Sequence, residues 1–330
     1  MYNCFLQRLS LQRTVQHILV PLVKRSSSSS SSASASTSTM STNQIDTIRE
    51  SFRRIGPGGS LRLTLNDETG IGLLRIQNVT KKNCFTGSMM AELTEHLEQV
   101  EKWKNGKALI IYGENGFFCS GGDLNTVRSI ADQDGGRKMI TLMQHNLKRL
   151  ECLPLITVAL VDGMALGGGA ELMTACDYRI ASRDSKIGFV QVRIGITTVW
   201  GGGARLVSII GYGRALNLIA TGRTFTADDG VQLGFIDHVL PSNGQSIIDD
   251  NDALKCVEEF LQPFLSLPRE TMLNGKCVTS SARNDLDRSL AEELEHGLKV
   301  WGGPVHSAAL SGKVNHRRGE IKTVNDKSCC

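Results

Sequence analysis

Two glycine-rich segments, each placed shortly after an apolar run, restrict most strongly what this 330-residue chain can fold into. The first, Phe117-Phe118-Cys119-Ser120-Gly121-Gly122-Asp123-Leu124, follows the apolar run 108–112. The second, Ala165-Leu166-Gly167-Gly168-Gly169-Ala170-Glu171-Leu172, follows the run 155–161. Short continuous apolar runs are typical of parallel strands that are buried on both faces. We therefore expect both segments to be strand-to-helix junctions in an α/β fold.

Glycine-rich junctions of this kind can bind a negatively charged oxygen. Glycine permits unusual backbone dihedral angles and lets a ligand approach the main chain closely. The first N–H groups of a helix have no partner within the helix and lie at the positive end of its dipole. Two junctions on neighbouring strands could each direct one N–H at the same oxygen, which is how an oxyanion hole is built.

Other glycine-containing motifs fit these segments poorly. The run Gly167-Gly168-Gly169 lacks the GxGxxG spacing of a dinucleotide site, and the acidic residue expected on a following strand is not evident. The chain has no GxxxxGKS or GxxxxGKT sequence, which excludes a P-loop, and no GxSxG nucleophile elbow. A tight turn without any ligand remains the simplest alternative for a single glycine run.

The rest of the chain alternates between strand-like and helix-like patterns. The alternating residues 61–65, the turn residues 66–70 and the apolar run 73–76 predict a hairpin. Strands and helices then alternate, which is typical of an α/β core with crossover connections, whereas strands nearly disappear after Gly213. The residue spacing predicts helices over 89–103, 135–150, 214–220, 227–233, 253–264 and 286–301.

The N-terminal segment differs in composition from the rest. Eleven of the seventeen residues 26–42 are serine, and so polar a segment cannot offset its ordering entropy. An acid-free sequence rich in Arg and Ser is typical of an organelle transit peptide, although a dispensable low-complexity extension has the same composition. We therefore expect a basic, Ser-rich, disordered leader over 1–58, an α/β core over 59–265, and a C-terminal helical region and tail over 266–330.

The first 45 residues account for the net charge of the chain. The chain has 37 Lys and Arg against 33 Asp and Glu, a formal charge of +4. Residues 1–45 carry four of those basic residues and no acidic one, so the body of the chain, residues 46–330, has no net charge. A neutral body argues against nucleic-acid binding, and no apolar run is long enough for a membrane helix. Nine cysteines without CxxC pairs indicate reduced thiols and argue against a zinc site.

The glycine junctions and the residues that follow them resemble a known family. Phe118-Cys119-Ser120-Gly121-Gly122-Asp123-Leu124, residues 165–172 and Ala175-Cys176-Asp177-Tyr178-Arg179 are similar to the signature loops of the enoyl-CoA hydratase/isomerase (crotonase) superfamily. The similarity continues through Trp200-Gly201-Gly202 and residues 226–236, and it covers roughly residues 60–310.

The resemblance implies a fold, a substrate class and an assembly. It implies a crotonase (ClpP-like) α/β spiral of ββα units, with C-terminal helices that mediate trimer formation, and hence a homotrimer or a hexamer. It also implies an acyl-CoA substrate whose thioester carbonyl is held by the backbone N–H groups of Gly122 and Gly168. Lys82, at the start of the family's CoA-binding loop, is a candidate for the CoA phosphates, as is Lys81, although a solvated pair of charges is the commoner outcome.

Within the superfamily, one branch resembles this chain most. The segments that carry this resemblance are Lys186-Ile187, Phe189-Val190, Trp200-Gly201-Gly202 and Val300-Trp301-Gly302-Gly303-Pro304. This resemblance implies decarboxylation of ethylmalonyl-CoA and, more slowly, of methylmalonyl-CoA, which would give butyryl-CoA or propionyl-CoA. The resemblance implies that no metal, biotin or other cofactor is needed, and it implies a role in clearing side products of fatty acid synthesis. It also implies the cytosol, whereas the leader composition favours the mitochondrion.

The pair Glu171 and Gln191 favours decarboxylation over hydration. Hydratases of this family have one glutamate just after the glycine run and a second twenty residues later; here the first is Glu171 and the second is replaced by Gln191. Hydration needs paired carboxylates to activate water and to deliver a proton, so simple hydration is disfavoured. Decarboxylation needs mainly a stabilised thioester enolate, and a neutral Gln191 removes a charge that would repel the substrate carboxylate.

Each of these residues also has an ordinary structural interpretation. Glu171 is expected to protonate the enolate, with a pKa raised by apolar neighbours, but a first-turn acid could instead stabilise its helix dipole. Gln191 could contact the substrate or be a surface amide, and Trp200 could line the substrate site or pack in the core. Asp123 is expected to cap the following helix.

Two other functions stay open. One is an enoyl-CoA isomerase or hydratase that uses Glu171 alone. The other is a crotonase-fold binding protein that has lost catalysis.

Overall fold

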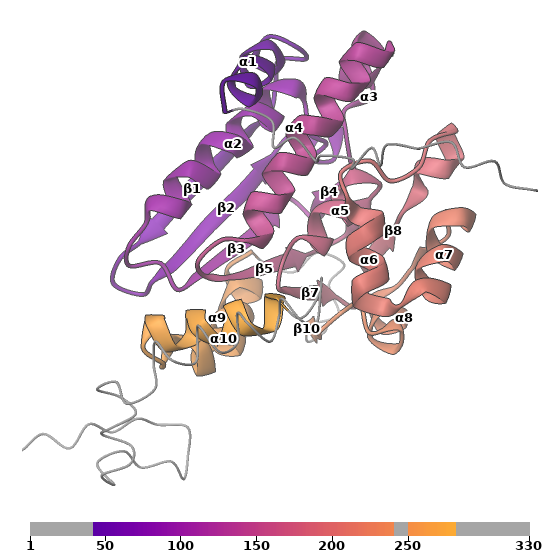
Figure 1. Cartoon of the computed structure of the whole chain (residues 1–330). Coiled ribbons are helices and arrows are strands. Elements are labelled where there is room, and N and C mark those ends of the chain that lie inside the picture. Colours follow the sequence, from indigo (N-terminus) through magenta and orange to yellow (C-terminus); the bar gives the residue numbers. More distant parts are fainter. Residues whose placement is uncertain (1–41, 241–249, 282–330) are drawn as a thin grey trace, which may run out of the picture. The chain divides into compact units, whose positions relative to one another are not determined.

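The structure, a computed structural model, describes residues 42–240 and 250–281, and its ordered part contains two β-sheets (Figure 1). The first is a six-stranded sheet in the order β1-β2-β3-β5-β7-β10, and the second has the order β4-β6-β8-β9. The strands of the six-stranded sheet are β1 (Ser60–Asn66), β2 (Ile71–Gln77), β3 (Ala108–Gly113), β5 (Ile156–Val161), β7 (Tyr178–Ser182) and β10 (His238–Leu240). Those of the second are β4 (Phe117–Cys119), β6 (Met164–Leu166), β8 (Lys186–Gly188) and β9 (Thr224–Phe225).

The order of elements repeats a unit of two strands followed by helical structure. β1 and β2 form the predicted antiparallel hairpin, and β2, β3, β5, β7 and β10 pair in parallel. After the hairpin, the pairs β3 and β4, β5 and β6, and β7 and β8 each give the first strand to the six-stranded sheet and the second to the smaller one. The last pair is reversed, because β9 joins the smaller sheet and β10 the six-stranded one. The helical elements are α1 (Thr42–Arg53), η1 (Val79–Lys81), α2 (Gly87–Lys102), α3 (Leu124–Ser129), α4 (Gln133–Glu151), α5 (Gly168–Thr174), η2 (Val190–Ile194), α6 (Gly202–Ile210), α7 (Tyr212–Thr221), α8 (Ala227–Leu233), α9 (Asp250–Leu265) and α10 (Arg269–Ser281).

The parallel strands are buried on both faces because helices cover both sides of the six-stranded sheet. Every residue of β3 and β5 is buried. Successive side chains of a strand point to opposite faces. Leu109 and Ile111 accordingly pack in the core that contains α2 and α4, whereas Ala108 and Ile110 pack in the core that contains α9 and α10 (Figure 1). The predicted α/β fold with crossover connections is confirmed.

Helix α1 extends the folded body further toward the N-terminus than the sequence prediction placed it. Its residues Ile45, Ile48 and Phe52 lie on one face of the helix and are buried in the core that α2 and α4 share. The predicted disordered leader over 1–58 therefore does not hold for its last part, because α1 buries an apolar face. Residues 1–41 lie outside the described residues.

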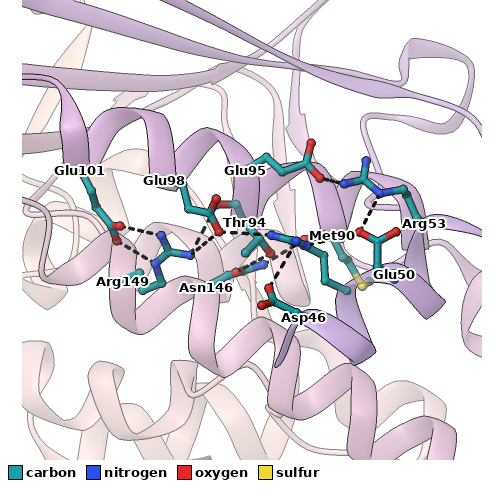
Figure 2. A network of polar contacts seen from close by, with 11 residues as sticks. Asp46, Glu50, Arg53, Met90, Thr94, Glu95, Glu98, Glu101, Asn146 and Arg149 are labelled. Atoms are coloured by element: carbon teal, nitrogen blue, oxygen red, sulfur yellow. Dashed lines mark hydrogen bonds and ion pairs between the residues drawn. The ribbon is translucent and has the colours of Figure 1, made fainter. Parts of the chain in front are cut away.

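Ion pairs connect the polar side of α1 to helix α2 (Figure 2). Arg53 pairs with Glu50 on its own helix and with Glu95 on α2. Arg49 pairs with Glu98 of α2 at 3.2 Å, and Arg149 of α4 pairs with Glu98 at 3.8 Å. Each exposed pair is worth under ~1 kcal/mol, so the buried apolar face supplies most of the attachment.

The predicted helices that fall within the described residues are all present. The prediction of a helix over 286–301 lies outside them, as does most of the predicted C-terminal region 266–330. Within the described ranges, no helix is long and apolar enough to cross a membrane.

Candidate active site

Both glycine junctions line one cavity of about 670 Å³. Four of the predicted site residues, Gly122, Gly168, Glu171 and Gln191, line it, and Trp200 lines it too. The remaining lining residues come mainly from α3, η2 and the segment before α6. The structure therefore brings together five of the six residues that the sequence singled out.

The first junction leads from β4 into α3. The backbone of Gly121 has a φ of 101°, a conformation that L side chains rarely adopt. Asp123 is the N-cap of α3, and its side chain accepts a hydrogen bond from the Thr126 N–H at 2.9 Å. The predicted capping role of Asp123 is confirmed, and the cap holds Gly122 between the strand and the helix.

The second junction leads from β6 into α5 and lies directly against the first. A Cβ atom on Gly121 would lie 3.2 Å from the Gly168 nitrogen, and one on Gly169 would lie 2.1 Å from the carbonyl oxygen of Cys119. Side chains at these positions would separate the two junctions, so glycine is required for the close approach. Neither Gly122 nor Gly168 donates its N–H to an acceptor within the described residues. Both groups are free to bind an oxygen in the cavity.

Trp200 packs against both glycines that carry the free N–H groups. A Cβ atom on Gly168 would lie 2.6 Å from carbons of the Trp200 ring, and one on Gly122 would lie 3.8 Å from it. The ring is 2% exposed and meets Phe85 edge-on, with 6.0 Å between the ring centroids. Trp200 is thus both a core aromatic and part of the cavity lining, so the two interpretations of this residue are compatible.

Glu171, on α5, is 1% exposed and accepts four hydrogen bonds. Its Oε1 atom accepts from Gln191 Nε2 at 2.7 Å and from the Val199 N–H at 3.2 Å. Its Oε2 atom accepts from the backbone N–H groups of Trp200 at 2.8 Å and Gly202 at 2.9 Å. The carboxyl group therefore organises the whole segment 199–202, which the sequence did not reveal.

The surroundings of Glu171 act on its pKa in opposite directions. Burial raises the pKa above its ordinary value of 4.5, and the hydrogen bonds from Gly202, Val199, Trp200 and Gln191 lower it; the net direction is upward. Gly202 must be glycine for this arrangement, because a Cβ atom there would lie 2.5 Å from Glu171 Cγ. The expected upward shift of the Glu171 pKa agrees with the direction found here.

Gln191 lies in η2, is 7% exposed and has its amide group against Glu171. Its nitrogen donates to the carboxylate, but its Oε1 atom is buried without a hydrogen-bond partner. The interpretation of Gln191 as a surface amide is wrong, because the side chain is buried in the cavity lining.

Lys82 is the one predicted site residue that does not line the cavity. Its ammonium group lies 5.9 Å from the centroid of the Phe117 ring. Lys81 lines the cavity instead, where its Nζ atom is 3.0 Å from Asp123 Oδ2. Lys82 ends η1 in a left-handed conformation, with φ of 54°, and the two neighbouring lysines contact different residues, Asp123 and Phe117.

Sequence reasoning missed Arg205, which supports the site from α6. Its Nη2 atom donates to the Trp200 carbonyl at 2.7 Å, and its Nε atom donates to Thr174 Oγ1 at 3.0 Å. Burial lowers the pKa of Arg205, while the charges of Glu151 and Glu171 raise it. Arg205 thus holds the carbonyl of Trp200, whereas Glu171 holds its N–H group. Nothing in the local sequence pattern distinguishes Arg205 from a surface arginine.

The comparisons with known proteins agree with this geometry. A family model described as enoyl-CoA hydratase/isomerase matches residues 66–301. A protein of Danio rerio named ethylmalonyl-CoA decarboxylase is 44% identical over 263 residues, which cover 79% of this chain and 86% of that protein. The protein of the same name from Mus musculus is 38% identical over 276 residues, 83% of each chain.

Solved structures show the same fold. An enoyl-CoA hydratase from Bacillus anthracis superposes with a TM-score of 0.69 at 24% identity, covering 76% of this chain and 95% of that one. An enoyl-CoA hydratase from Mycobacterium smegmatis superposes with a TM-score of 0.70 at 20% identity, covering 80% and 99%. The resemblance read from the glycine junctions is confirmed.

Proposed function

Because the chain belongs to the enoyl-CoA hydratase/isomerase family, we propose that it is an acyl-CoA decarboxylase that converts ethylmalonyl-CoA into butyryl-CoA and carbon dioxide. The named relatives, which match about four fifths of the chain at 38–44% identity, support this substrate. The observation that carries the proposal is the pairing of one buried carboxyl group, Glu171, with the neutral amide of Gln191 beside two free backbone N–H groups.

The two free N–H groups supply the main chemical requirement of the reaction. A malonyl-type thioester loses carbon dioxide when the electrons of the breaking carbon–carbon bond flow into the thioester carbonyl, which becomes an enolate oxygen. The N–H groups of Gly122 and Gly168 are positioned on adjacent junctions and are rigidly held by the Asp123 cap and by Trp200. Donors fixed in advance stabilise the enolate more than the neutral thioester, and each such donor is worth roughly 10²–10³ in kcat.

A single carboxyl group suits decarboxylation better than hydration. A second carboxylate at position 191 would face the substrate carboxylate, and two such charges 4 Å apart repel by about 4 kcal/mol in a partly buried site. Gln191 avoids this repulsion. Glu171, with its raised pKa, holds the proton that is delivered to the α-carbon of the enolate.

The charged residues of the cavity lining suit an anionic substrate. Lys81, Arg128 and Arg193 line the cavity, and Asp123 already accepts hydrogen bonds from Thr126 and Lys81. We assign the substrate carboxylate to one of these cationic groups of the cavity lining. Lys82, outside the lining, stays a candidate for the CoA phosphates.

The finer features of the proposal rest on the family resemblance. They are a slower reaction with methylmalonyl-CoA, a homotrimeric or hexameric assembly, a place in the cytosol, and a role in clearing side products of fatty acid metabolism. The transit-peptide composition of the leader supports the mitochondrion as the alternative compartment.

Incubation of the purified full chain with ethylmalonyl-CoA, methylmalonyl-CoA and crotonyl-CoA in separate reactions tests the function. Release of carbon dioxide, fastest from ethylmalonyl-CoA, is expected. Turnover of crotonyl-CoA alone would identify a hydratase, and tight binding of the three thioesters without turnover would identify a binding protein. Either result would overturn the proposal.

A further inference from the structure

The unpartnered oxygen of Gln191 is the one feature of the site that decarboxylation by Glu171 does not explain. Within the described residues, Gln191 Oε1 is a buried side-chain atom without a hydrogen-bond partner, and it belongs to a residue that lines the cavity. Leaving a buried acceptor unpaired costs about 1–3 kcal/mol. We therefore expect Gln191 Oε1 to accept a hydrogen bond in another state of the site.

A protonated oxygen of Glu171 could be this donor, and the hydrogen bonds of Glu171 determine which of its two oxygens can carry the proton. Glu171 Oε2 accepts from two backbone N–H groups, those of Trp200 and Gly202, which cannot turn into acceptors. Glu171 Oε1 accepts from one backbone N–H, that of Val199, at the longer distance of 3.2 Å, and from the side-chain amide of Gln191. A proton placed on Oε2 would point at two donors. A proton placed on Oε1 can be accommodated if the Gln191 amide turns.

The torsional barrier to turning the amide is low. The terminal torsion of a glutamine side chain has a broad, nearly two-fold profile, and the nitrogen and oxygen ends of the amide have almost the same shape. The backbone carbonyl of Gln191 is held by the N–H of Ile196, so the rotation needs no movement of the main chain. After rotation, Oε1 of Gln191 faces Oε1 of Glu171.

We propose that Gln191 is a proton-coupled switch: its amide donates to Glu171 Oε1 when Glu171 is a carboxylate, and turns to accept the Glu171 O–H when Glu171 is a carboxylic acid. This inference rests on the proposed function, since it names the residue that lets Glu171 exist in both states of the proton cycle. Gln191 acts through Glu171 and is therefore a positioning residue.

The proton balance of the cycle follows from the proposed reaction. The carbon–carbon bond of the substrate breaks, carbon dioxide leaves, and its bonding electron pair becomes that of the enolate. The O–H bond at Glu171 Oε1 then breaks as a C–H bond forms at the α-carbon, which leaves Glu171 as a carboxylate. Gln191 turns its nitrogen toward that carboxylate, and one proton from solvent restores the acid before the next substrate binds.

No other charged group near this pair can take the place of the Gln191 oxygen. Arg205 of α6 acts on Glu171 by its charge, and the cavity lining adds Arg193 from η2, Arg128 from α3 and Lys81. Arginine and lysine side chains only donate hydrogen bonds. Asp123 at the start of α3 could accept, but it already accepts from Thr126 and Lys81.

Neutron diffraction from crystals of the ligand-free full chain, exchanged into heavy water at one acidic and one alkaline pH, locates the relevant deuterons. At alkaline pH we expect a deuteron of Gln191 Nε2 facing Glu171 Oε1. At acidic pH we expect a deuteron on Glu171 Oε1 facing Gln191 Oε1. The same amide orientation at both pH values, or a deuteron on Oε2 of Glu171, would overturn the switch. Because no substrate is present, the result does not depend on whether ethylmalonyl-CoA is turned over.

Steady-state kinetics of Gln191→Met separates positioning from substrate contact. Methionine keeps the length of the side chain but can neither donate strongly nor accept as an amide does. We expect kcat for carbon dioxide release to fall at least tenfold with little change in KM, together with an altered pH profile of kcat. A raised KM with unchanged kcat and an unchanged pH profile would instead show that Gln191 only contacts substrate, and would contradict the switch.

Discussion

The side-chain amide of Gln191 donates a 2.7 Å hydrogen bond to the buried carboxyl group of Glu171, twenty residues earlier in the chain. The bond joins α5 to η2 in the lining of the cavity. It places a neutral amide, and not a second carboxylate, beside Glu171. The predictions below follow from this pair and from the junctions beside it.

Replacing Glu171 should separate its chemical role from its structural one. Glu171→Ala leaves the backbone N–H groups of Val199, Trp200 and Gly202 unpaired in a buried site, so we expect a loss of about 3 kcal/mol in the free energy of unfolding. Glu171→Gln keeps an acceptor for most of these donors and should fold almost normally. Both variants should lose at least about 100-fold in kcat. Urea unfolding and carbon dioxide release measure the two effects, and near-normal turnover in Glu171→Gln would contradict the assigned role.

Restoring the second carboxylate should move the chemistry toward hydration. In Gln191→Glu, two carboxyl groups would share the space of the present 2.7 Å contact, so one of them must keep a proton at neutral pH. We expect measurable water addition to crotonyl-CoA and slower decarboxylation of ethylmalonyl-CoA. Gln191→Met is the matched control and should gain no hydratase activity. Equal crotonyl-CoA turnover in both variants would show that the carboxylate pair is not what separates the two reactions.

Adding one methyl group at Gly168 should disturb the oxyanion donors. In Gly168→Ala the Cβ atom would lie 2.6 Å from Trp200 ring carbons, so the ring or the junction must shift. We expect kcat to fall by roughly 10²-fold, the effect of losing one oxyanion donor. Gly136→Ala, in α4 with no atom within 4 Å of the added Cβ, should keep full activity and gain about 0.5–1 kcal/mol in stability. Decarboxylation as fast in Gly168→Ala as in Gly136→Ala would mean that the donors are elsewhere.

The raised pKa of Glu171 predicts a specific pH dependence of stability. A carboxyl group whose folded-state pKa exceeds its ordinary value of 4.5 binds its proton more tightly in the folded chain. Its contribution to the free energy of unfolding is therefore fully present below about pH 4.5 and is lost as the pH rises through the folded-state pKa. The unfolding free energy of the natural chain, relative to that of Glu171→Gln, should therefore decrease as the pH rises over that interval. A difference that is constant with pH would contradict the upward shift.

Truncation should show that α1 belongs to the catalytic body. A chain that begins at residue 42 keeps α1 and should retain full stability and activity. A chain that begins at residue 59 loses the buried side chains of Ile45, Ile48 and Phe52, each worth about 1.5–3 kcal/mol, and should unfold at a markedly lower urea concentration. Equal stability of the two chains would show that α1 contributes nothing to the fold.

Much of the site could be predicted because its residues lie in local patterns. The glycine junctions follow buried strands, Asp123 caps the next helix as its position suggests, and Glu171 lies directly after the second glycine run. Local sequence also contained the signal for α1, since Ile45, Ile48 and Phe52 have helical spacing. The serine-rich residues before them obscured that signal.

The rest of the site depends on contacts between distant segments. The three backbone N–H groups that bind Glu171 come from residues 199–202, and only the packed fold brings them to α5. The choice of Lys81 over Lys82 depends on the left-handed backbone of Lys82, which residue type alone does not predict. Arg205 supports Trp200 through a carbonyl that no sequence motif identifies.

The most direct test of the central claim is the mass of the product formed from ethylmalonyl-CoA by the full chain in heavy water. An enolate that is protonated by Glu171 after loss of carbon dioxide should yield butyryl-CoA with one deuterium at the α-carbon, in equal amount to the carbon dioxide released. Glu171→Gln should form this product at least about 100-fold more slowly. Unchanged ethylmalonyl-CoA, in a preparation that turns over crotonyl-CoA, would contradict the assignment.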